Sequence, residues 1–107
     1  MMEAAERKLT NLLSMAQKAG GIVSGTFAVE QAIKGKQAKY LLVAADAAEE
    51  TRKTYRELAD RYGIPFSLCL TKELLGECLG KEYRAVAVLQ DAGFGKALAK
   101  LVGEGKF

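Results

Sequence analysis

The sequence contains one glycine-rich stretch around which its other patterns are arranged, Gly20-Gly21-Ile22-Val23-Ser24-Gly25-Thr26. Three glycines fall within six positions around a short apolar pair, and hydroxyl side chains then lead into residues with helical apolar spacing. The pattern predicts the end of one helix, a short strand and the exposed amino end of a second helix. Such an amino end favours phosphate or carboxylate, because its backbone N–H groups are unpaired. Composition alone leaves anion binding and simple chain reversal equally open.

On both sides of this stretch, helical and extended patterns alternate along the chain. Helical periodicity lies at residues 3–18, 25–35, 46–62, 71–80 and 91–103. Apolar runs typical of strands lie at 22–23, 40–45, 66–70 and 85–89. This order predicts one domain over residues 1–107, an α/β fold built as a three-layer α/β/α sandwich. We expect a small, mixed, four-stranded sheet with helices on both faces.

Two local patterns refine this prediction. Asp46 and Glu49 have the spacing of a capping box, which predicts that Asp46 opens the helix ending at Tyr62. That helix has an apolar stripe in which Tyr62 is expected to face inward. Cys69 and Cys78 lie in apolar settings without C-x-x-C spacing, so we expect two buried free thiols rather than a disulfide.

Composition excludes several classes of function. The chain has 107 residues, 50% of them hydrophobic and 27% charged, as in an ordinary globular protein. No apolar run approaches the ~20 residues of a membrane span, and the first residues lack the order of a secretion signal, so we expect a cytoplasmic protein. Histidine, the commonest general base and metal ligand, is absent. Metal-ligand spacing, G-x-S-x-G and a P-loop are absent as well, so we expect no enzyme and no catalytic residue, metal, cofactor or small-molecule substrate. Ser24 is interpreted as a cap or phosphate contact rather than a nucleophile.

A net charge of +3 permits nucleic-acid binding but does not argue for it alone. Lys34, Lys36 and Lys39 crowd the end of a predicted helix, where complementing the helix dipole is the simpler account. Tyr83 and Arg84 form an aromatic and basic pair on a loop, which suits stacking and phosphate contact in RNA recognition. Phe27 either folds back into the core or offers its ring to an unstacked base.

Several short motifs occur in a recognisable order. They are Ser24-Gly25-Thr26 opening a helix, Ala38-Lys39 before a strand, Ala45-Asp46-Ala47 after it, Gly63-Ile64-Pro65, and Leu75-Gly76-x-x-x-Gly80-Lys81. This set resembles the kink-turn-binding ribosomal protein superfamily of large-subunit proteins seven-Ae and thirty-e, and most of all its bacterial YlxQ-type members. The resemblance covers about residues 9–102. It implies a non-catalytic, ribosome- or translation-associated protein that binds kinked or structured RNA, with ribosomal RNA among the candidates.

The resemblance also implies where RNA would bind. Three loops at one end of the sandwich form the family's RNA site, so the expected partner is RNA, and we expect the chain to be a monomer. The candidate RNA-binding residues are Ser24, Gly25, Thr26, Phe27, Gln31, Lys72, Glu82, Tyr83 and Arg84. Gly25 and Thr26 match the positions that approach the RNA backbone, and Lys72 matches a lysine of many members. Glu82, Tyr83 and Arg84 fall in the loop that packs on a flipped-out nucleotide.

This chain departs from the family at the positions that read guanine edges. The best-known binders carry Asn, Glu and Lys where this chain has Phe27, Ala28 and Gln31. Gln31 can hydrogen-bond and Phe27 can stack, but Ala28 cannot accept from guanine. A bidentate base contact is worth ~1–3 kcal/mol of discrimination, so these residues predict weaker base readout with backbone contacts retained.

Two other functions remain open. A protein–protein module that kept the fold while its RNA face drifted would explain why Phe27 and Ala28 make this turn apolar. A binder of small nucleotides or phosphate would rest on the glycines alone.

Overall fold

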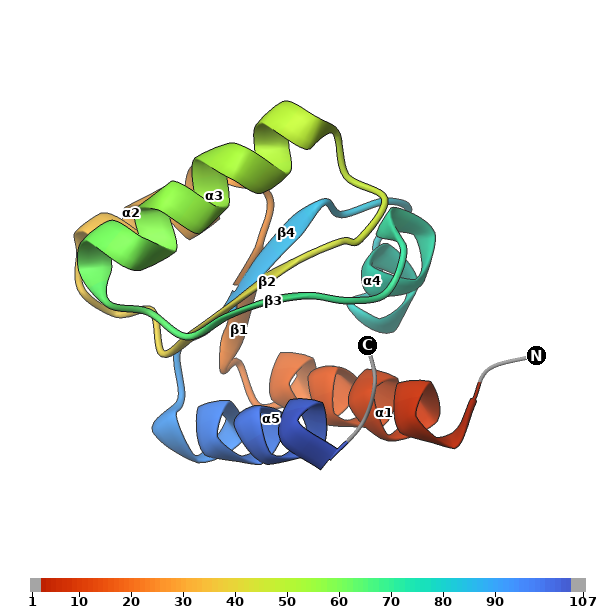
Figure 1. Ribbon diagram of the computed structural model, residues 1–107. Helices are drawn as coiled ribbons and strands as arrows, with labels where there is room; N and C mark the ends of the chain where they lie inside the picture. The colour runs from red at the N-terminus through yellow and green to blue at the C-terminus, as the bar shows by residue number, and fades with distance from the viewer. Residues whose placement is uncertain (1–2, 105–107) are drawn as a thin grey trace.

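The computed structural model describes residues 3–104, in which helices and strands alternate as predicted (Figure 1). The helices are α1 (Ala4–Lys18), α2 (Thr26–Lys34), α3 (Glu49–Tyr62), α4 (Lys72–Cys78) and α5 (Ala92–Glu104). The strands are β1 (Ile22–Ser24), β2 (Tyr40–Val43), β3 (Phe66–Leu68) and β4 (Val86–Leu89). Among the described residues, no helix combines the length and apolar character needed to cross a membrane.

The four strands form one mixed sheet in the order β1-β4-β2-β3. Strand β4 pairs antiparallel with both β1 and β2, and β2 pairs parallel with β3. Helices α2 and α3 cover one face, α1 and α5 cover the other, and α4 packs against α1 (Figure 1). The predicted three-layer α/β/α sandwich is therefore confirmed.

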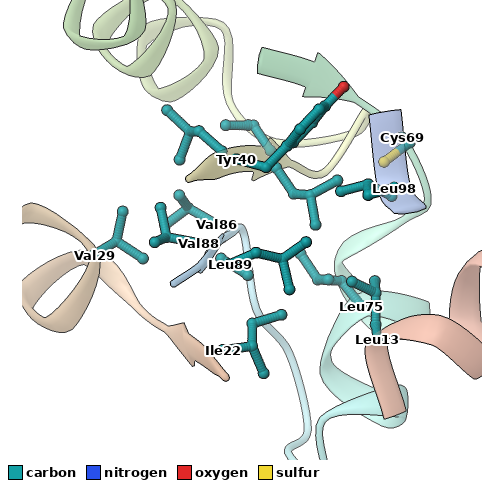
Figure 2. Packing of buried hydrophobic residues seen from close by; sticks show 14 of the residues in the cluster. Leu13, Ile22, Val29, Tyr40, Cys69, Leu75, Val86, Val88, Leu89 and Leu98 are labelled. Atoms are coloured by element: carbon teal, nitrogen blue, oxygen red, sulfur yellow. The ribbon is translucent and has the colours of Figure 1, made fainter. Parts of the chain in front are cut away.

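The core lies on both sides of the two central strands. All residues of β2 and β4 are buried, which is why their sequences are continuous apolar runs rather than alternating ones. Side chains from the helices meet the sheet there, with Leu13 and Leu98 on one face and Val29 on the other (Figure 2). Cys69 and Cys78 are free thiols, as predicted, although Cys78 is only half-buried. Burial raises the pKa of the Cys69 thiol to about 12.

Two predictions about element bounds and faces are wrong. The strands predicted over 40–45 and 66–70 end at Val43 and Leu68. In the second segment the chain turns where Leu70 adopts a φ of 63°, which an extended residue does not have. The backbone there is still paired across the two segments, since the Ala45 amide donates to the Leu70 carbonyl at 2.9 Å. Tyr62, expected to face inward, is 39% exposed because it lies in the last turn of α3.

A buried tyrosine of α3 lies near a carboxylate of α2. The Tyr55 side chain is 3% exposed. Burial, and then the nearby Glu30 carboxylate, raise the pKa of Tyr55 to about 12. The first turn of α2 belongs to the end of the molecule described below.

Gly76 sets how closely α4 approaches the loop before β4. A Cβ at this position would lie 2.7 Å from the Glu82 carbonyl oxygen and 2.8 Å from the Tyr83 Cα. We expect Gly76→Ala to lower the free energy of unfolding by ~1–3 kcal/mol, because the overlap is with backbone that cannot turn aside. Urea unfolding followed by circular dichroism measures the loss.

Gly103→Ala is the matched control for this substitution. A Cβ at Gly103 in α5 would meet nothing within 4 Å, so we expect no loss and a gain of up to about 1 kcal/mol from helix propensity. Equal effects of the two substitutions would contradict the close approach of α4 to the loop.

Candidate nucleic-acid interface

Four chain segments meet at one end of the sheet, where β4 begins. The Gly25 amide donates to the Val86 carbonyl at 3.0 Å, which ties the β1–α2 turn to the start of β4. The Ala44 amide donates to the Ala85 carbonyl at 2.8 Å, which ties the end of β2 to the same place. The start of α4 is joined to them through Arg84 and Asp46, as described below. This is the end at which sequence reasoning expected a site.

The β1–α2 turn depends on glycine for its backbone angle rather than for space. Gly25 is the N-cap of α2, with φ 90° and ψ 152°, a region that residues other than glycine rarely adopt. A Cβ there would come no closer than 3.9 Å to the Arg84 Nε. The first turn of α2 has no side-chain cap and no acidic residue, so its amino end keeps its affinity for an anion.

Arg84 connects three of these segments. Its Nε donates to the Ser24 Oγ at 3.0 Å, and its Nη1 donates to the Tyr83 carbonyl at 2.8 Å. Its backbone amide donates to the Lys72 carbonyl at 3.1 Å. Within the described residues these bonds use two of the five guanidinium N–H donors. The half-buried guanidinium is therefore held in one orientation beside Gly25 with donors left for an anion.

Asp46 holds α4 and not α3, which corrects the predicted capping box. Helix α3 begins at Glu49 with Ala48 as its N-cap and no side-chain cap. The Asp46 Oδ1 instead accepts from the Lys72 amide at 2.8 Å, while the Thr71 Oγ1 accepts from the Leu74 amide at 3.1 Å. Two of the unpaired amides at the start of α4 are thus satisfied, and Lys72 is fixed beside Arg84.

Two aromatic side chains flank this centre and are open to solvent. Phe27 in the first turn of α2 is 76% exposed, and Tyr83 next to Arg84 is 61% exposed. Of the two alternatives for Phe27, the core is excluded and the exposed ring remains. Gln31 is exposed one turn further along α2, on the same face as Phe27 because residues four apart are neighbours on a helix.

The far side of the Tyr83 loop is acidic. Glu82 and Tyr83 line a hollow of about 480 Å³ together with Glu73, Glu77 and Lys81. Three carboxylates against one ammonium disfavour phosphate there. Among the predicted residues, Ser24, Gly25, Lys72 and Arg84 are therefore brought together, whereas Glu82 faces an acidic surface. Sequence reasoning missed the role of Asp46, since its partner lies 26 residues away and no local pattern indicates it.

This combination of fold and loops defines a family. Residues 7–99 match the family model described as the ribosomal protein L7Ae/L30e/S12e/Gadd45 family, and the chain belongs to that family. The resemblance inferred from the sequence motifs is thereby confirmed.

Two relatives with similar sequences are both YlxQ proteins. The RNA-binding protein YlxQ of Bacillus subtilis (strain 168) is 33% identical over 91 residues, covering 85% of this chain and 91% of the relative. The RNA-binding protein YlxQ of Enterococcus faecium is 28% identical over 102 residues, covering 95% and 98%. These two proteins are what the chain is most usefully compared with in sequence.

Two solved structures resemble the chain in fold. A protein with unknown function from Bacillus halodurans C has a TM-score of 0.84 and 30% identity, covering 88% of this chain and 95% of its own. The Giardia lamblia 15.5kD RNA binding protein has a TM-score of 0.77 at 20% identity, covering 97% and 89%. Because the identity to the Giardia lamblia protein is 20%, this comparison shows a shared fold alone.

The Asp46 contact is tested by comparing substitutions in the two helices it was assigned to. We expect Asp46→Ala to lower the free energy of unfolding by ~0.5–2 kcal/mol, as for loss of a cap, and Asp46→Asn to cost less because an acceptor remains. Glu49→Ala removes only a carboxylate in the first turn of α3, worth ~0.3–1 kcal/mol. Urea unfolding of the three variants measures the loss in free energy of unfolding for each. A larger loss in Glu49→Ala than in Asp46→Ala would favour the capping box at the start of α3.

Proposed function

We propose that this chain is a non-catalytic RNA-binding protein that engages kinked or structured RNA through the β4-start end of the sheet. The observation that carries the proposal is Arg84, which hydrogen bonds hold in place beside the open backbone turn at Gly25. Family membership and the names of the YlxQ relatives support it. Association with ribosomes or translation, and ribosomal RNA as the target, are part of the same proposal.

Two of the donors to the RNA backbone are already oriented. They are the Arg84 guanidinium, held by hydrogen bonds, and the amides at the uncapped start of α2 near Ser24 and Thr26. These two groups need little ordering when a phosphate arrives, and Lys72 adds an ammonium beside them. Phosphate contacts position the RNA without reading its sequence.

Contacts to bases are of a different kind in this chain. Phe27 and Tyr83 offer aromatic faces on which unpaired bases stack. Gln31 can hydrogen-bond a base edge, and Glu82 can accept from a base amino group. Ala28 offers no acceptor to guanine. We therefore propose recognition of RNA shape and unstacked bases, with weaker guanine discrimination than the family's best-known binders.

A protein–protein module remains the second candidate. The observation that favours it is the exposed ring of Phe27, since an apolar side chain 76% open to water suits a protein surface as well as a base. If RNA bases stack on this ring, removing it lowers RNA affinity. If the ring contacts a protein partner instead, RNA affinity stays the same.

Arg84→Ala tests the phosphate contacts. We expect weaker binding to a kink-turn RNA and a salt slope reduced by roughly one unit or less. Fluorescence anisotropy at several salt concentrations measures both, with a straight duplex of equal length for comparison. The matched control is Arg7→Ala, which removes an exposed arginine of α1 and should leave binding unchanged. Equal affinity of the wild type for both RNAs would rule out recognition of the kink.

Phe27→Ala tests stacking against the protein-module alternative. Stacking on an aromatic side chain is worth ~1–3 kcal/mol per base, so we expect RNA affinity to fall about five-fold or more by that scale. Met15→Ala removes another exposed apolar side chain, 54% open on α1, and should have no effect. Unchanged RNA affinity in Phe27→Ala would favour the protein module.

A further inference from the structure

Two neighbouring hollows lie at the end of the sheet opposite the candidate nucleic-acid interface. The Lys39 amide donates to the Leu89 carbonyl at 2.7 Å, and the Leu41 amide donates to the Pro65 carbonyl at 2.9 Å. These bonds place both connections, α2–β2 and α3–β3, where β4 ends rather than where it begins. The two connections lie together at the left of Figure 1.

The hollows share these two connections. The first, of about 430 Å³, is lined by Ile33, Lys36, Ala38, Arg61, Tyr62 and Ile64. The second, of about 250 Å³, is lined by Lys39, Tyr40 and Pro65 together with residues of α5. In the α2–β2 connection, Ala38 lines the first hollow and Lys39 the second. In the α3–β3 connection, Ile64 lines the first hollow and Pro65 the second. We call the pair the basic groove.

The floor of the basic groove is largely aliphatic. Ile33, Ala38 and Ile64 line the first hollow, while Pro65, Ala92 and Ala99 line the second. Tyr62 at the first hollow is 39% exposed. Side chains of a peptide fill such hollows, whereas RNA bases are recognised mainly on aromatic faces. Among the described lining residues Tyr62 is the one exposed aromatic ring, so the mainly aliphatic lining favours a protein segment over RNA.

The charge around the groove has one sign. Of the described residues that line the two hollows, the charged ones are Lys36, Lys39, Arg61 and Lys96. The nearby Asp91 carboxylate is engaged, since it accepts from the Phe94 amide at 3.0 Å. The partner that complements this surface is an acidic segment with apolar anchors.

Helix dipoles do not account for all of these cations. Lys36 and Arg61 lie near helix carboxyl ends, where a positive charge is favourable. Lys96 instead lies in the second turn of α5, towards its amino end, and gains nothing from that dipole. Lys36 has a φ of 58° at the position just after the helix cap where glycine is usual, so a lysine is strained there.

We propose that the basic groove docks an acidic, apolar-anchored segment of a protein partner. The surface is separate from the candidate nucleic-acid interface, so RNA and the segment can be held at the same time. The proposal does not rest on RNA binding, and either site can fail without the other.

The probe is a synthetic peptide in which Asp and Glu alternate with Leu and Phe, titrated into ¹⁵N-labelled protein. We expect amide shifts at Ala38–Leu41, Ile64 and Phe66, and none at Gly25 or Arg84. A peptide with Ser in place of Leu and Phe, and one with Lys in place of the acids, should each lose binding. Absence of shifts at millimolar peptide, or stronger shifts of the same amides with single-stranded RNA of equal charge, would overturn the proposal.

Lys36→Gly separates docking from folding. The substitution removes a rim charge while relieving the strained φ, so we expect the urea midpoint to stay or rise and peptide affinity to fall roughly two- to five-fold. Lys96→Ala should weaken the peptide by a similar factor. Arg84→Ala should leave peptide affinity unchanged. If Lys36→Gly and Lys96→Ala bind the peptide as tightly as the wild type, the groove is not its site.

Discussion

Strand β4 needs apolar cover on both faces and hydrogen-bonded neighbours on both edges, and the other elements are arranged to supply these. All of its residues are buried, with β1 along one edge and β2 along the other. Its two ends are consequently the two places where polar chain emerges from the core. Arg84 precedes β4 at one end. At the other end lie the α2–β2 connection, which contains Lys39, and the β4–α5 connection, which contains Asp91.

The hydrogen bonds at the beginning of β4 explain why loop residues there can act together. The Arg84 side chain, the Lys72 carbonyl and the Ser24 hydroxyl come from three separate segments. None of these contacts contributes greatly to stability alone, since a typical hydrogen bond adds ~0.5–1.5 kcal/mol. Their effect is to hold the Arg84 guanidinium, the backbone of Lys72 and the uncapped start of α2 in fixed relation. That preorganisation is what a phosphate-binding surface requires.

Local pattern is sufficient to predict most of the fold and, within the candidate site, the turn at Gly25. The buried strands β2 and β4 were predicted because double-sided burial leaves a continuous apolar run, and Gly25 because a helix entry is recognisable in sequence. Contacts between distant segments leave no such trace. The Lys72 backbone amide donates to the Asp46 carboxylate, 26 residues away, whereas the local pattern around Asp46 favours a different helix.

The same limit applies to faces of helices near their ends. Phe27 and Tyr62 both sit in terminal turns, where apolar spacing continues although the sheet no longer lies beneath it. Sequence alone therefore left Phe27 undecided and placed Tyr62 inward, whereas they are 76% and 39% exposed. Likewise, Lys36 and Lys39 were attributed to a helix dipole, because only the topology brings Arg61 and Lys96 to the same surface.

The distribution of charge between the two ends bears on how an RNA would choose its site. The net charge of +3 is uneven, since the Tyr83 loop borders three glutamates while the basic groove presents four cations. Long-range attraction therefore does not direct a polyanion to the β4-start end. Binding there depends on oriented donors that act at short range. An acidic segment seated in the basic groove would neutralise the competing charge. Docking of a partner would then favour RNA at the interface built around Arg84 without any change in that interface.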